Sequence, residues 1–266
     1  LTTARQRGEM TLARLETAVL QAGLSMPNRT ADFEGVFVVG TSPQINLLTP
    51  LRNVISGWNK PVYLCEVAGT VGTTTYFKKM GLVYCLGSGI GVLEEGHEVA
   101  DNDPIVLKLS AACPDNQVKA ATAAAPTDGW VTFSGCQTPF VVKEISTDRK
   151  ELTVMISKRD LIPFFAELQY VRALCAYVDS PGGTSPQFYI QDVTRGPAQP
   201  VMEGVSQGLF SFNENSNLFT VHLLVRGNRR FPGQVTSSVP GWPGAISDED
   251  RHYRLVAMSA SWRVRN

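Results

Sequence analysis

Several features common in membrane proteins and nucleic-acid-binding proteins are scarce in this sequence of 266 residues. No apolar run approaches the roughly 20 residues that a helix needs to span a bilayer, and no stretch has the pattern of a signal peptide. Charged residues make up only 18% of the chain and balance to a net charge of zero, so bulk charge indicates no nucleic-acid or acidic partner. The 43% hydrophobic content still supports a substantial core in one large domain or two small ones.

Residues that usually carry chemistry are equally sparse. The three histidines, His97, His222 and His252, do not lie at metal-ligand spacing from one another or from a cysteine. No serine sits in a nucleophile elbow, and the glycine run Gly87–Gly91 leads into a short acidic stretch instead of the helix that a phosphate loop requires. We interpret that run as a plain turn. The sequence therefore predicts no catalytic residue, no metal site and no cofactor, and we do not expect an enzyme.

The five cysteines lack the C-x-x-C spacing of zinc or thioredoxin-type sites, so we consider disulfides in an oxidising compartment. The preferred pairs are Cys113–Cys136 and Cys65–Cys85. Each would close a loop of about 20 residues and stabilise the fold by about 3 kcal/mol on chain-entropy grounds. Cys175 lies in an expected strand and is interpreted as a buried free thiol. The alternative is that all five are reduced core residues.

The clearest local pattern is an amphipathic helix over Leu1–Gly23. Its apolar positions recur at spacings of three and four and predict one face packed against a sheet; they are Leu12, Leu15, Val19 and Ala22. Gly23 and Pro27 suit the end of a helix, whereas no start signal precedes Leu1. We expect that the helix is the lower half of a longer one.

After the helix, short apolar runs and turn residues predict antiparallel strands. The expected strands are Val36–Val39, Pro61–Cys65, Asp103–Leu109, Val131–Phe133, Phe140–Lys143, Glu167–Tyr177, Gln187–Gln191, Gly208–Phe212, Leu218–Val225 and Tyr253–Val264. Pro50–Gly57 could be a short helix or a turn. Phe231–Asp250 reads as a loop long enough to be a functional or mobile excursion. One helix followed by antiparallel strands predicts an α+β fold.

Basic residues concentrate late in the chain, where paired strand ends could form a patch for DNA phosphates or an acidic partner. The residues of this candidate patch are Arg226, Arg229, Arg230, Arg251 and Arg254. Asp248, Glu249 and Asp250 lie among them and dilute the charge. The alternative interpretation is an ordinary sheet end held by salt bridges.

Several segments, taken in order, resemble one family. Leu15–Pro27 is similar to the helix exit of PilW-like minor pilins of type IV pili, where a Gln-Ala-Gly element leads into a loop. Asp101–Ser110 resembles the strand of that family that begins with an Asp. Pro200–Val205, followed by Leu209–Phe212, resembles the family's Leu-Val-Glu-Gly-Val strand. The last segment, Tyr253–Asn266, ends in Arg-Asn, as these proteins do. The type II secretion pseudopilin J is a close cousin.

The resemblance implies a pilin-like α+β fold, with a truncated helix and its exit over residues 1–27 and a single β-rich head domain over 28–266. It implies a structural minor pilin that initiates or tips a pilus, with other minor and major pilins as partners. Arg5, Arg7 and Glu9 of the helix would then face neighbouring subunits. The missing half-helix would hold it in the inner membrane, facing the periplasm, before it joins the extracellular pilus. Alternatives are a tip adhesin, a DNA-uptake receptor subunit or a type II secretion minor pseudopilin. A secreted hydrolase is disfavoured because histidines are so few.

Overall fold

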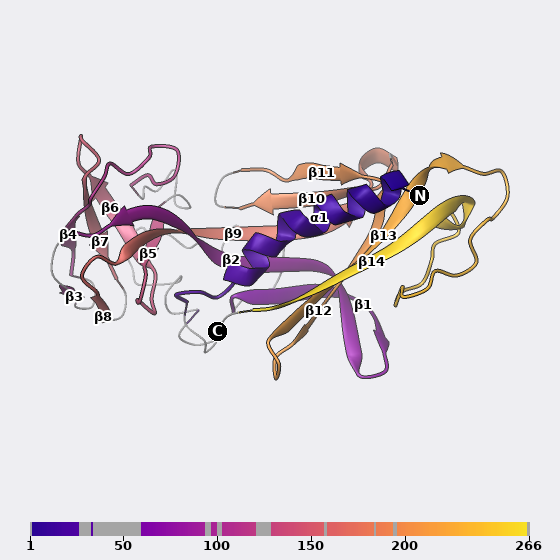
Figure 1. Ribbon diagram of the computed structural model, residues 1–266, viewed down its shortest axis with the longest axis horizontal. Helices are drawn as coiled ribbons and strands as arrows, with labels where there is room; N and C mark the ends of the chain where they lie inside the picture. Colours follow the sequence, from indigo (N-terminus) through magenta and orange to yellow (C-terminus); the bar gives the residue numbers. More distant parts are fainter. Residues whose placement is uncertain are drawn as a thin grey trace.

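The protein is β-rich, with 53% strand and 13% helix, and the predicted pilin-like α+β fold class is wrong. The computed structural model describes residues 2–26, 33, 60–93, 97–99, 103–120, 129–156, 159–183, 185–193 and 196–264. Within them, one N-terminal helix accompanies a twelve-stranded sheet in an elongated molecule (Figure 1). The prediction placed one helix on antiparallel strands, whereas strand residues far outnumber helical residues and the strands continue into a second lobe that the helix does not reach.

The helix α1 (Thr2–Gln21) is built from a narrow buried face and a broad polar one. The buried positions share one side of the helix: Ala4, Gly8, Thr11, Leu12, Leu15, Ala18 and Val19. The helix ends at Gly23, whose φ of 76° only glycine adopts without strain and whose N–H donates to the Val83 carbonyl at 3.0 Å. Ala22 forms a β-bridge with Tyr84, so the helix exit is attached directly to the sheet.

The strands form one antiparallel sheet with the order β14-β13-β12-β2-β9-β5-β6-β7-β4, flanked by β1 on β2 and by β10 and β11 beside β9. Their bounds are β1 Val62–Val71, β2 Thr74–Gly91, β4 Ile105–Lys108, β5 Trp130–Phe133, β6 Phe140–Ile145, β7 Glu151–Met155, β9 Glu167–Asp179, β10 Gln187–Asp192, β11 Gln199–Glu203, β12 Val205–Asn213, β13 Leu218–Arg230 and β14 Tyr253–Arg263. A separate pair joins β3 (His97–Val99) to β8 (Asp160–Ile162).

The long central strands β2 and β9 run from the distal end of the sheet to the part that lies under α1, and so connect the two parts of the molecule (Figure 1). Strand β9 is buried on both faces, because Leu174 and Ala176 pack toward α1 while Val171, Ala173 and Cys175 pack on the opposite side. Even the charged Arg172 is only 1% exposed. The same strands then enter a third core at the far end of the molecule, where Ile90 and Leu168 are buried.

At that far end the sheet closes on itself, and we call this part the distal lobe. The ring of strands runs from the end of β2 through β9, β5, β6, β7 and β4. It closes where Val92 bridges Leu109, where the Leu93 N–H donates to the Lys108 carbonyl at 2.9 Å, and where the Ser110 N–H donates to the Gly91 carbonyl at 2.8 Å. Because closure removes a free sheet edge, the lobe encloses its own apolar core.

The glycine run 87–91 makes that closure possible. It lies at the end of β2, where the pairing with β9 shifts between Gly87 and Gly91. Gly89 has a φ of 70°, and its N–H donates to a Glu167 carboxylate oxygen at 2.8 Å. The run is thus an irregularity within a strand, which bends β2 into the distal lobe.

The long loop 231–250 is anchored to the sheet. The Phe231 N–H donates to the His252 carbonyl, the Val235 N–H donates to the Arg251 carbonyl, and a Cβ on Gly244 would touch Leu209 of β12. Two 3-10 turns complete the fold, at Pro181–Gly183 and Asp250–His252. The expected elements at Val36–Val39 and Pro50–Gly57 lie outside the described residues. None of the described helices is long and apolar enough to cross a membrane.

Candidate interaction surfaces

The four residues predicted to join helix and sheet lie in the core between them. Leu12, Leu15, Val19 and Ala22 pack with side chains from β2, β12 and β13, among them Leu82, Phe210 and Val221. Leu15 and Val19 are fully buried. Each buried aliphatic side chain of this size contributes about 1.5–3 kcal/mol relative to solvent exposure, so the helix is a fixed part of the domain.

The opposite side of α1 faces solvent and mixes apolar with charged residues. Met10 is 57% exposed and Leu20 is 39% exposed, while Arg5 and Glu9 are exposed beside them. Arg7 differs from the prediction that it faces outward, because its guanidinium donates to Asn228 Oδ1 at 2.9 Å and lies over Gly204. The helix therefore offers an outer surface without Arg7.

All five cysteines are free thiols, and neither predicted disulfide is present in the structure. Cys65 lies opposite Lys79 in the β1–β2 ladder, so Cys85 is six residues further along β2, about 20 Å away at the rise of a strand. That separation is far beyond the reach of a disulfide. Cys113 and Cys136 are both buried in the core of the distal lobe as free thiols, and the Cys136 Sγ contacts the Leu161 carbonyl at 3.5 Å.

Three of the five arginines in the predicted patch are neutralised by carboxylates of the same chain. Arg230 forms a two-bond pair with Glu249, and Arg251 lies 3.8 Å from Asp248. Arg226 donates to Asp250 Oδ1 at 2.6 Å, in a pair of which Asp250 is only 2% exposed. For these three residues the structure matches the alternative interpretation of a salt-bridged sheet end.

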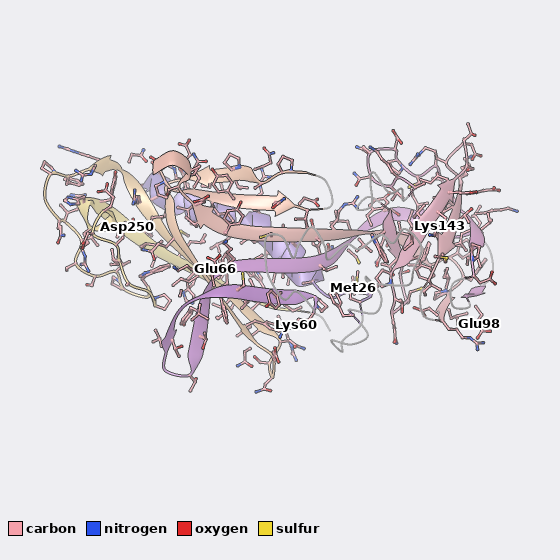
Figure 2. All side chains as sticks on the ribbon, turned by 180° about the vertical axis from the view of Figure 1, so that it is seen from behind. Met26, Lys60, Glu66, Glu98, Lys143 and Asp250 are labelled. Atoms are coloured by element: carbon pink, nitrogen blue, oxygen red, sulfur yellow. The ribbon has the colours of Figure 1, made fainter. Side chains whose placement is uncertain are left out.

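Asp250 connects the elements at this end of the molecule. Figure 2 labels it at the end opposite Glu98 and Lys143. Its carboxylate accepts hydrogen bonds from Arg226, Gln207 and Ser247. Burial favours the neutral acid, but these bonds outweigh it and hold the pKa of Asp250 below its usual value. The three donors lie on β12, on β13 and in the loop 231–250, so the hydrogen bonds to Asp250 attach the loop to the sheet.

The two remaining arginines of the patch flank one aromatic ring. The guanidinium carbons of Arg229 and Arg254 lie 5.2 and 5.7 Å from the centroid of Phe231. Both arginine side chains are exposed, and among the described residues neither has a carboxylate partner. The cation–π contacts orient the two charges without neutralising them. Of the five arginines in the predicted patch, only Arg229 and Arg254 have a charge that no described carboxylate neutralises, so it remains available to bind an anionic group.

The sequence interpretation missed an aromatic turn on the distal lobe. Phe164 and Phe165 connect β8 to β9, are 50% and 62% exposed, and have ring centroids 4.0 Å apart. Phe165 has a φ of 57°, which bulky residues rarely adopt. Two adjacent phenylalanines between Pro163 and Ala166, outside any periodic apolar pattern, were the available signal.

The histidines and acidic residues of the described segments do not gather into a metal site. No group of three or more His, Cys, Asp or Glu side chains in this part of the chain is placed to hold a metal ion. His222 packs edge-on against Tyr76, and burial lowers its pKa, which favours a neutral structural ring.

Comparison with known proteins adds no relative. No protein-family model, curated protein or solved structure matches this chain. Its function must therefore be argued from the surfaces described above.

Proposed function

We propose that this protein is a structural subunit of a type IV pilus, a minor pilin that initiates or tips the fibre. The observation that carries the proposal is the arrangement of α1, which is buried along one side in the domain and open along the other. A helix of this kind can pack against neighbouring helices while its own sheet domain stays attached. The proposal depends on the helix alone, and the family's α+β fold is no part of it.

The attachment of α1 suits a subunit that transmits force. Tension on the helix would pass to the sheet through two consecutive backbone links, the bridge from Ala22 to Tyr84 and the bond from Gly23 to Val83. Trp262 of β14 adds a side-chain bond, donating from Nε1 to Glu16 at 3.2 Å. The links act at the C-terminal end of the helix, which leaves its outer face free for other subunits.

The proposal assigns the protein partners and a location. Major and other minor pilins would contact the outer face of α1 through Arg5, Glu9, Met10 and Leu20. The subunit would stand in the inner membrane and periplasm before assembly and on the extracellular pilus afterwards. A minor pseudopilin of type II secretion would use the same helix in a shorter fibre. We expect no catalytic activity in either case.

The test is incorporation into fibres in the source organism. The native gene is replaced by variants with Met10→Glu or Ala13→Glu, which place a charge on the outer face of α1. We expect the wild-type protein in the sheared-pilus fraction and both variants retained with the cells, with fewer fibres by electron microscopy. Val71→Glu, at an exposed position at the end of β1, is the matched control and should behave as wild type. Absence of the wild-type protein from fibres, with fibre number unchanged on gene deletion, would refute the proposal.

The Arg229–Phe231–Arg254 cluster favours a second candidate function, a tip receptor that binds DNA. Two uncompensated guanidinium groups beside an aromatic ring can contact neighbouring phosphates. In an electrophoretic mobility-shift series, we expect the Arg229→Ala/Arg254→Ala variant to weaken binding and to reduce the salt slope by about two. Arg230→Ala removes a charge already paired with Glu249 and is the control. Equal binding by both variants and the wild type would exclude this surface.

A further inference from the structure

Strand β14 is a long edge of the main sheet. Within the described part of the chain it pairs only with β13, at one end of the strand order. Its register with β13 is regular from Leu255 to Arg263. Between Leu255 and Trp262 it has no proline, no charged residue and no bulge, which are the features that usually protect an edge from pairing. Such an edge is a template for another strand.

The hydrogen bonds of β14 show which of its backbone groups point away from β13. The Val264 N–H donates to the Asn217 carbonyl at 2.8 Å, so the even-numbered residues of β14 direct their backbone groups toward β13. The odd-numbered residues direct theirs outward, and no described residue bonds to the outward groups of Leu255, Ala257, Ser259 and Ser261.

The loop 231–250 covers the start of the same edge. The Val235 N–H donates to the Arg251 carbonyl at 2.8 Å, and Thr236 Oγ1 donates to the Tyr253 carbonyl at 2.7 Å. These bonds occupy the outward groups that precede Leu255. The outward groups from Leu255 to Ser261 follow the covered part, and they are arranged symmetrically about Met258.

The helix α1 runs beside β14 in the same direction (Figure 1). A Cβ on Gly8 would overlap Met258 Sδ, and further along Trp262 Nε1 donates to Glu16 at 3.2 Å. Arg7 bonds to β13 and lies about 180° around the helix from Glu16. Glu16 is therefore on the side of α1 nearest the open edge.

This edge has apolar side chains at its middle and opposite charges near its ends. Arg254 is exposed, and none of the described carboxylates pairs with it. Glu16 is also exposed and, of the described side chains, bonds only to Trp262. The apolar residues between them on the α1 face are covered only in part by the core, and they are Val256, Met258 and Ala260.

We infer that β14 pairs with β14 of a second copy of this chain, antiparallel and about a two-fold axis at Met258. Ala257 then lies opposite Ser259 of the second copy and Leu255 opposite Ser261, and each pair exchanges its outward N–H and C=O groups. A two-fold contact closes on itself and forms a dimer. The inference goes beyond the pilin proposal and does not depend on it.

The same register brings the uncompensated charges together. Residues at equal distances from Met258 face one another, so Arg254 lies opposite Trp262 of the second copy, to which Glu16 of that copy is bonded. The guanidinium can stack on the indole and pair with the carboxylate. The two-fold axis repeats this contact at the other end of the interface. This charge complementarity is why the occupant of the edge is a second copy.

The experiment is sedimentation equilibrium of the purified chain over a concentration series. We expect the wild-type mass to rise from one chain to two as concentration increases. Ala257→Pro removes an outward N–H and places a ring in the path of the second strand, while the bonds to β13 remain. It should raise the dissociation constant of the dimer at least about tenfold and keep the wild-type circular dichroism spectrum.

A second variant gives the same test without proline. Ser259→Lys places two like charges diagonally across the axis, and it should also raise the dissociation constant at least about tenfold. Ala68→Lys adds the same charge at an exposed position on β1 and is the matched control. The control should dimerise as the wild type does.

A charge exchange tests the register. Arg254→Glu places a carboxylate beside Glu16 of the second copy and should weaken the dimer about tenfold, whereas Arg254→Glu/Glu16→Arg should restore most of the affinity. The inference is overturned if the wild type stays monomeric or forms larger open assemblies, or if Ala257→Pro and Ser259→Lys dimerise as the wild type does. A dimer that both β14 variants weaken but the charge exchange does not restore overturns the register about Met258.

Discussion

At the scale of single residues, buried polar groups distinguish this chain more than any motif does. Asp250 is acidic, flanked by other charges and nearly inaccessible, and it ties three strands or loops together. The sequence analysis treated Asp250 as one of three acidic residues that reduce the net positive charge of the basic patch. Its role became visible only when Gln207 and Arg226 were placed beside it, because those partners lie 43 and 24 residues away in the chain.

The first prediction concerns the pH dependence that Asp250 creates. Its pKa is lowered on folding, so its stabilising effect is complete above the unfolded value near 3.8 and disappears as pH falls through the folded value. Asp250→Asn should lower the free energy of unfolding at pH 7 by about 3 kcal/mol, because Arg226 loses its buried partner. Urea denaturation at pH 7 and near pH 2 should show this difference shrinking in acid. Asp248→Asn, at a carboxylate 95% exposed, is the control; an equal loss in both variants would contradict the argument.

The second prediction concerns the thiols. Burial raises the pKa of Cys136 and of Cys175 to about 12, and it also raises the pKa of Cys85. At pH 8 a thiol with that pKa is ionised in only about one molecule in ten thousand, so native labelling with a disulfide reagent should be slow. Cys65, which is half-buried, should react first. In denaturant without reductant we expect five labelled thiols; fewer than five would indicate that a predicted disulfide forms in the purified protein.

At the scale of elements, the helix is where sequence and structure agree most closely. Its apolar positions lie three and four residues apart, and a helix of that pattern has one side to bury, whatever lies beneath it. Most strands in the second half were located for the same local reason. Strands β3, β7 and β8 were missed, because each has only three to five residues. Strand β2 was not among the expected strands, because the glycines at its C-terminal end resemble a turn.

The third prediction tests the attachment of the helix. Leu15→Ala should lower the free energy of unfolding by about 2–5 kcal/mol, because Leu15 is fully buried against the sheet and its removal leaves a cavity. Leu20→Ala makes the same chemical change on the outer side of α1 and should cost well under 1 kcal/mol. Both values come from urea denaturation followed by circular dichroism. Similar losses for the two variants would show that the helix is not packed as described.

At the scale of the whole molecule, two strands connect cores that would otherwise be separate. β2 and β9 contribute Leu82 and Ala176 to the core under α1, and Ile90 and Leu168 to the core of the distal lobe. Because β2 and β9 run through both cores, unfolding of these strands in one core would disturb the other core. The elongated shape is therefore compatible with a single cooperative unit.

The fourth prediction follows from that continuity. Thermal unfolding followed by far-ultraviolet circular dichroism and by tryptophan fluorescence should give one coincident transition. Phe140→Ala in the distal core and Phe219→Ala in the core under α1 should each shift the whole transition downward, by about 3–5 kcal/mol in stability. Two separate transitions, with each variant moving only one, would mean that the lobes unfold independently.

The sequence alone determined the helix, its buried face and many of the strands, because these depend on the spacing of apolar residues over a few turns of chain. It also pointed to the late arginines, but it could not say which of them are paired. The tertiary structure decided that Arg229 and Arg254 keep their charge and that all five cysteines are free thiols. It also closed the distal lobe and left Phe164 and Phe165 exposed. Those outcomes depend on contacts between residues far apart in the chain, and strand order and register, which local spacing does not encode, set those contacts.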